Sequence, residues 1–74
     1  MKVKASMSNH IDRMIEEERQ LRINVNNLRA FIQSNEIFDT LAKDERYRMI
    51  KQLSGMEVYL QALSERLMVA AGDY

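Results

Sequence analysis

The stretch MIKQLSGMEVYLQALSERL, residues 49–67, decides the fold. Its apolar residues recur at alternating spacings of four and three, the pattern of a helix packed lengthwise on another helix. They are Met49, Leu53, Met56, Leu60, Leu63 and Leu67. A weaker copy of the pattern lies upstream, at Met7, Ile11, Met14, Leu21, Val25, Leu28 and Ile32. Together the two patterns predict an all-α fold: an antiparallel two-helix hairpin with coiled-coil-like packing.

The remaining residues divide the chain into two helices and a connection, which we expect to form a single domain over residues 1–74. Helix 1 is expected over about 9–33, with Ser8 or Asn9 as its N-cap. The connection, about 34–43, is expected to be a short helical turn whose Phe38 covers the end of the hairpin. Asn35 is the residue most able to end helix 1 in a left-handed conformation. Helix 2 is expected over about 44–71.

Composition narrows the class of partner. The chain has 11 basic and 11 acidic residues with the signs interspersed, so it lacks the positive field on which DNA binding depends. It has no cysteine, which excludes disulfides and thiolate metal sites. A hairpin of 74 residues has a thin core, so we expect a homo-oligomer. No signal peptide or membrane-spanning apolar run is evident, which predicts a soluble, cytoplasmic protein without a membrane partner.

Two residues depart from the helical pattern. Glu18 falls at a position of the apolar seam, where an unpaired carboxylate is costly to bury. Arg66 is the expected partner, and the alternative is that Glu18 marks a polar site or sets the register of an oligomer. Gly55 lies in mid-helix, where glycine costs about 1 kcal/mol relative to alanine. Close approach of another helix is its expected explanation, and a bound ligand or neutral tolerance of the glycine are the alternatives.

Polar and aromatic residues spaced seven apart flank the seam on one side. Helix 2 contributes Gln52, Tyr59 and Arg66, and helix 1 contributes Asn24. One interpretation is structural: Glu17 pairs with Arg66, Asn24 bonds Gln52 or Tyr59, and the polar residues fix the register. In the other interpretation Tyr59 stacks on a planar ring, Gln52 and Asn24 read its edge, and Arg66 or Arg13 binds a phosphate.

The opposite flank carries Arg22 and Arg29 on helix 1 and Glu57 on helix 2. An Arg22–Glu57 pair across the hairpin is expected, with an anion site at the two arginines as the alternative. The lone His10 is expected to be exposed and has no second imidazole for a metal site. No catalytic constellation or phosphate-binding loop is present, so we expect neither enzyme activity nor a cofactor.

Read as spaced residues, the chain resembles a family of very short bacteriophage proteins named after an open reading frame of a crAss-like phage. The matching positions are Arg13, Glu17, Leu21, Leu28, Phe31, Ile32, Phe38, Leu41, Glu45, Gln52, Leu53, Met56, Tyr59, Leu60, Leu63 and Arg66. A departure is Ala42, where such proteins carry a capping Ser or Asp. Proteins of this kind are similar in build to phage sponge proteins that oligomerise and sequester cyclic nucleotide signals of the CBASS and Thoeris immune systems. The resemblance implies binding without turnover, with Tyr59, Gln52, Arg66 and Arg13 as candidates.

Three hypotheses follow for the function. The first is an oligomeric sponge for a cyclic nucleotide signal. The second is an antagonist that binds a host defence protein through apolar residues off the seam, namely Ile15, Ile23, Val58 and Met68. The third is a structural coiled-coil module without a ligand.

Overall fold

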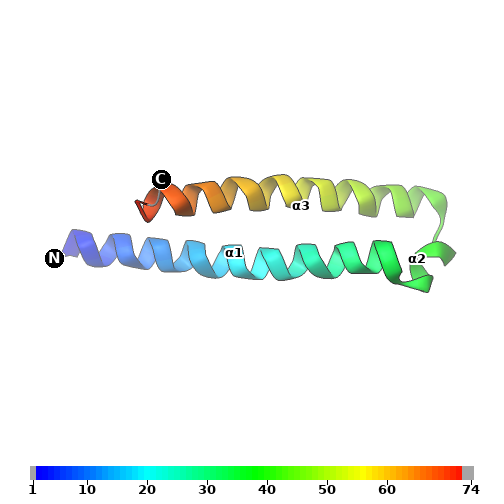
Figure 1. Ribbon diagram of the computed structural model, residues 1–74, viewed down its shortest axis with the longest axis horizontal. Helices are drawn as coiled ribbons and strands as arrows, with labels where there is room; N and C mark the ends of the chain where they lie inside the picture. Colours follow the sequence, from blue (N-terminus) through cyan, green and yellow to red (C-terminus); the bar gives the residue numbers. More distant parts are fainter. Residues whose placement is uncertain (1, 73–74) are drawn as a thin grey trace.

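The computed structural model is a helical hairpin of three helices, α1 (Lys2–Ser34), α2 (Glu36–Thr40) and α3 (Lys43–Ala70). It describes the backbone of residues 2–72 and the side chains of residues 9–72. α1 and α3 lie antiparallel, side by side, and α2 covers the end at which the chain reverses (Figure 1). The chain measures 56 × 18 × 17 Å along its principal axes. The all-α hairpin predicted from the sequence is confirmed.

The core is the seam between α1 and α3. Its best-buried side chains are Val25 and Leu63, each 1 % exposed. Met14 and Leu21 are also buried, and partly buried side chains of α3 pack against this cluster; they are Leu53, Met56, Leu60 and Leu67. Every one of these residues belongs to the predicted apolar pattern, so the alternating spacing identified the face that each long helix buries.

α1 begins earlier than expected. The structure places its first residue at Lys2, whereas the sequence suggested a start at about residue 9 after a cap at Ser8 or Asn9. The residues before Ser8 include Lys4, Ala5 and Met7, which favour helix, and neither proline nor glycine interrupts them. The helix therefore continues through Asn9. The side chains of Met7 and Ser8 lie outside the described part of the chain.

The connection is capped differently from the prediction. Asn35 has an extended backbone, φ −93° and ψ 126°, rather than a left-handed one. Its side-chain oxygen accepts a 2.9 Å hydrogen bond from the Ile37 backbone N–H, so Asn35 begins α2 as an N-cap. Phe38 is buried and packs edge-on against Phe31 with ring centroids 6.2 Å apart. The aromatic pair closes the end of the hairpin, as predicted for Phe38.

α3 begins without a side-chain cap. Ala42 occupies the N-cap position and makes no side-chain hydrogen bond, although its carbonyl accepts the first helical bond from Arg46. Asp44 and Glu45 in the first turn interact favourably with the helix dipole but leave the terminal N–H groups without the usual partner. The first turn of α3 is therefore less stable than it would be with a residue at position 42 whose side chain could cap it.

Replacing Ala42 with serine should raise the free energy of unfolding by about 1 kcal/mol, because the hydroxyl would accept a hydrogen bond from the first turn. The backbone at Ala42, φ −59° and ψ 146°, already suits a cap. Urea unfolding followed by circular dichroism measures the change. Ala30→Ser, at an exposed site inside α1, is the control and should be neutral or slightly destabilising. No gain from Ala42→Ser would contradict this account of the helix start.

Gly55 does not have the neighbour that the sequence suggested. A Cβ atom added there would meet no atom within 4 Å, so neither α1 nor α2 packs against it. Close approach of another helix of the same hairpin is thus wrong as an explanation. Among the described residues, no helix combines the length and the apolar character needed to cross a membrane.

Candidate functional site

A cavity of about 540 Å³ lies beside Tyr59, between α1 and α3. We call it the Tyr59 cavity. It is lined by Arg13, Glu16, Glu17, Gln20, Leu21, Asn24 and Tyr59. All but Tyr59 come from successive turns of α1, and Leu21 forms the floor because it belongs to the buried seam. It is open to solvent along the flank of the hairpin, because every lining side chain except Leu21 is exposed.

The Tyr59 cavity combines an aromatic ring, two amides and one cation with two carboxylates, those of Glu16 and Glu17. Tyr59 is 46 % exposed, so its ring has a free face. Asn24 accepts a 3.2 Å hydrogen bond from the Gln20 amide, which leaves its own NH₂ group free to donate. Arg13 forms no ion pair with any described side chain, so its guanidinium can bind an anion. These groups suit a ligand with a planar ring and a phosphate.

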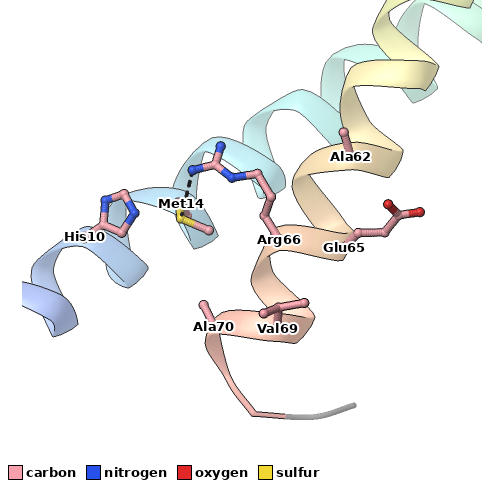
Figure 2. A pocket seen from close by; sticks show the side chains of 7 residues that line it. All are labelled: His10, Met14, Ala62, Glu65, Arg66, Val69 and Ala70. Carbon is pink, nitrogen blue, oxygen red and sulfur yellow. Dashed lines mark hydrogen bonds between the residues drawn. The ribbon is translucent and has the colours of Figure 1, made fainter.

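A second cavity, of about 510 Å³, lies nearer the ends of the long helices, around Arg66. We call it the Arg66 cavity. It is lined by His10, Met14, Ala62, Glu65, Arg66, Val69 and Ala70. Figure 2 shows Arg66 reaching from α3 toward α1, where its Nη2 donates to the Met14 sulfur at 3.8 Å. A thioether is a weak acceptor, so the charge of Arg66 is not neutralised by this contact.

The structure places the five predicted ligand-binding residues in three locations. Arg13, Asn24 and Tyr59 share the Tyr59 cavity. Arg66 lines the neighbouring cavity. Gln52 lines neither, and its amide donates to the Met56 sulfur at 3.8 Å.

The structural interpretation of the polar residues is wrong in its details. Asn24 bonds Gln20 of its own helix rather than Gln52 or Tyr59. Arg66 pairs with neither Glu17 nor Glu18. Gln20 and Glu16 line the cavity and were not predicted, although Glu16, Gln20 and Asn24 follow one another at intervals of four residues and so lie on one face of α1.

Glu18 is held by Arg22 and Ser64 instead of Arg66. The carboxylate pairs with Arg22 one turn along α1 and accepts a 3.0 Å hydrogen bond from the Ser64 hydroxyl of α3. The hydrogen bond from Arg22 holds the pKa of Glu18 below its ordinary value of 4.5, against the opposing effect of partial burial. Glu18 therefore remains charged beside the seam and links the two long helices through Ser64.

Glu18 should make the stability of the hairpin depend on pH. Because its folded-state pKa is depressed, its contribution is present above about pH 4.5 and is lost as pH falls through the folded-state value. We expect the urea midpoint to fall more between pH 7 and pH 3 in the native chain than in Glu18→Gln. The other carboxylates are the same in both proteins, including Glu16, whose pKa is lowered by a hydrogen bond from Arg19. Equal losses in the two proteins would contradict this role.

The opposite flank is neutralised by internal pairs. Arg29, rather than Arg22, forms the ion pair with Glu57 across the hairpin, at 2.5 Å. Arg22 is occupied by Glu18 on its own helix. The predicted Arg22–Glu57 pair is therefore wrong, and both arginines of the alternative anion site already have carboxylate partners. Arg13 and Arg66, in contrast, form no ion pair with a described side chain, although carboxylates line both of their cavities.

Several apolar side chains stand in solvent away from the seam. Those named for a protein-binding face, Ile15, Ile23, Val58 and Met68, are all exposed. His10 is exposed as predicted.

Comparison with known proteins gives a family. A family model described as Sequestin matches residues 8–69, which is most of the chain and includes every residue that lines the Tyr59 cavity. Neither the curated proteins nor the solved structures contain a match.

Proposed function

We propose that this chain, which belongs to the Sequestin family, sequesters a cyclic nucleotide signal of bacterial immunity without turning it over. In this proposal it is a phage anti-defence protein that acts as a homo-oligomer in the host cytoplasm. The family name indicates sequestration rather than catalysis, and a sponge requires only groups that bind.

The observation that carries the proposal is the composition of the Tyr59 cavity. The Tyr59 ring offers a stacking surface for a base, and stacking is worth about 1–3 kcal/mol per base. The free NH₂ of Asn24 can donate to the edge of that base. Arg13 can bind phosphate through two parallel hydrogen bonds. A cyclic nucleotide presents all three features, a ring, a polar edge and a phosphate.

A melting panel tests the proposal. The protein is heated with cyclic dinucleotides, cyclic trinucleotides and cyclic ADP-ribose isomers, and with AMP as the control. A compound present at 100 times its dissociation constant stabilises the folded state by about 2.7 kcal/mol, which raises the melting temperature by several degrees. We expect a shift with at least one cyclic compound and a smaller shift with AMP, which has one base and a single phosphate. No shift with any member at millimolar concentration would contradict the proposal.

A second candidate is a protein-binding antagonist of a host defence enzyme. It is supported by the exposed apolar side chains, of which Val58 is the most prominent at 70 % exposure. Pull-down from host lysate with the native chain and with Val58→Glu separates this candidate from a sponge. A stoichiometric host protein that is lost with Val58→Glu would favour the antagonist.

A further inference from the structure

A third cavity opens at the end of the hairpin where the chain reverses, between α2 and the start of α3 (Figure 1). We call it the Arg46 cavity. α2 contributes Phe38 to its lining, and the first turns of α3 contribute Lys43, Arg46, Tyr47 and Ile50. None of these residues lines the Tyr59 cavity or the Arg66 cavity, so the proposed function does not use them.

Three of the lining side chains provide apolar surface. Phe38 is buried and packs edge-on against Phe31, which fixes the position of its ring. Tyr47 and Ile50 are three residues apart, so they are neighbours on one face of α3, and both are exposed. Covering such apolar surface removes it from water, which is favourable. The lining therefore suits an aromatic or aliphatic group.

The charged residues of the Arg46 cavity are both cations. Lys43 and Arg46 form no ion pair with any described side chain. Neither Asp nor Glu is among the residues that line this cavity. Glu16 and Glu17, in contrast, line the Tyr59 cavity, and Glu65 lines the Arg66 cavity. An anion in the Arg46 cavity would therefore meet two positive charges and no carboxylate of the lining.

Arg46 has a hydrogen-bond donor without an acceptor. Its Nε is buried and has no partner among the described residues, although buried N–H groups are nearly always paired. The side chain is partly buried, and a charge that is partly removed from water attracts an anion more strongly than an exposed one. Asp44 and Glu45 in the same part of α3 do not line the cavity, and Glu45 is paired with Arg48. The guanidinium of Arg46 is therefore available to a ligand.

We propose that the Arg46 cavity binds a small apolar molecule with one anionic group, a carboxylate or a phosphate. Arg46 donates to the anionic group and Lys43 adds a second positive charge. The apolar body of the ligand lies against Tyr47 and Ile50. A nucleotide fits less well, because no side-chain amide or carboxylate lines this cavity to pair with the polar edge of a base. This site is independent of the proposed function.

Two-dimensional NMR of the backbone amides of the native chain tests the site. The probes are phenylacetate and phenyl phosphate, which join a ring to a carboxylate or to a phosphate. The controls are benzyl alcohol, which lacks the charge, and acetate and inorganic phosphate, which lack the ring. We expect saturable shifts at Phe38 and within residues 43–50 with at least one probe, and the better probe identifies the anionic group.

Both halves of the probe should contribute to binding, because the cavity has both cations and apolar surface. The three controls should therefore bind more weakly than the better probe. Acetate, inorganic phosphate or benzyl alcohol binding as tightly as that probe would overturn the proposal. Probe shifts that are absent at millimolar concentration, or that lie only around the Tyr59 or Arg66 cavity, would also overturn it.

Arg46→Gln should weaken binding of the better probe by about tenfold, because the charged donor is lost while a side chain of intermediate length remains. Arg48→Gln is the matched control. Arg48 lies on the same helix but is paired with Glu45 and does not line the cavity, so its loss should change the affinity by less than about twofold. Native affinity in Arg46→Gln, or equal losses in the two variants, would contradict the role of Arg46.

A carboxylate introduced into the cavity is a second test, which does not alter a partly buried residue. Ile50 is exposed, so Ile50→Glu should keep its helical content by circular dichroism, but the new carboxylate should repel the probe and abolish its binding. Val58→Glu makes the same change at an exposed site of α3 outside the cavity and should bind the probe as the native chain does. Native affinity in Ile50→Glu would overturn the site.

Discussion

Leu63→Ala should lower the free energy of unfolding by about 2–5 kcal/mol, the usual cost of removing a buried leucine side chain. Leu63 is 1 % exposed and packs in the centre of the seam, in contact with the cluster formed by Met14, Leu21 and Val25. Small domains are marginally stable, so this loss is a large share of the total. We expect the variant to be mostly unfolded well below the melting temperature of the native chain.

Urea unfolding monitored by circular dichroism measures the effect of Leu63→Ala. Met68→Ala on the same helix is the control, because Met68 is 50 % exposed and lies off the seam. Its cost should be within about 0.5 kcal/mol. A similar loss in the two variants would show that the seam between α1 and α3 is not the core.

Tyr59→Ala should weaken binding of the proposed cyclic nucleotide ligand by about 5- to 150-fold, which corresponds to the 1–3 kcal/mol that base stacking contributes. Tyr59 is outside the buried core, so the helical content of the variant should be unchanged. Tyr59→Phe keeps the ring and should retain most of the affinity. Titration calorimetry of the native chain and both variants measures the difference.

Tyr47→Ala is the control for Tyr59→Ala. Tyr47 is also an exposed tyrosine of α3, but it lies near the start of that helix and lines neither the Tyr59 nor the Arg66 cavity. Its removal should leave the affinity within about twofold of the native value, a change of less than 0.5 kcal/mol. Native affinity in Tyr59→Ala, or equal losses in the two variants, would exclude stacking on Tyr59.

The hairpin could be predicted from the sequence because its apolar spacing leaves only one face on each long helix that can be buried. Shifting either helix by one position exposes residues such as Leu21 and Leu63, and that cost is large. The helix start was less predictable. Ser8 and Asn9 are favourable caps, but Lys4 and Ala5 before them favour helix, and the difference in free energy is small.

The ion pairs could not be predicted for a similar reason. Arg22 has carboxylates within reach on its own helix and on α3, and each exposed pair is worth less than about 1 kcal/mol. The sequence pattern therefore gave no basis for choosing Glu18 over Glu57. Arg29 lies about two turns further along α1 and forms the ion pair with Glu57 instead.

The candidate site was predictable in part because of helix geometry. The seven-residue spacing put Asn24 and Tyr59 on one flank of the hairpin, and the structure brings both to one cavity together with Arg13. The same spacing separates Gln52, Tyr59 and Arg66 by about 10.5 Å each along α3, and of these three residues only Tyr59 lines the Tyr59 cavity. The sequence therefore shows which residues lie on the same side of the seam. Which of them line the same cavity depends on side-chain packing.

Recovery of the bound molecule tests sequestration most directly. The protein is incubated with the cyclic nucleotide of the melting panel that stabilises it most and is passed through a filter that retains protein. The filtrate and the heat-denatured protein are then analysed by mass spectrometry. We predict that the molecule is depleted from the filtrate and is released by heat at its original mass and in full yield. A molecule that stays in the filtrate, or that returns cleaved, would contradict the account.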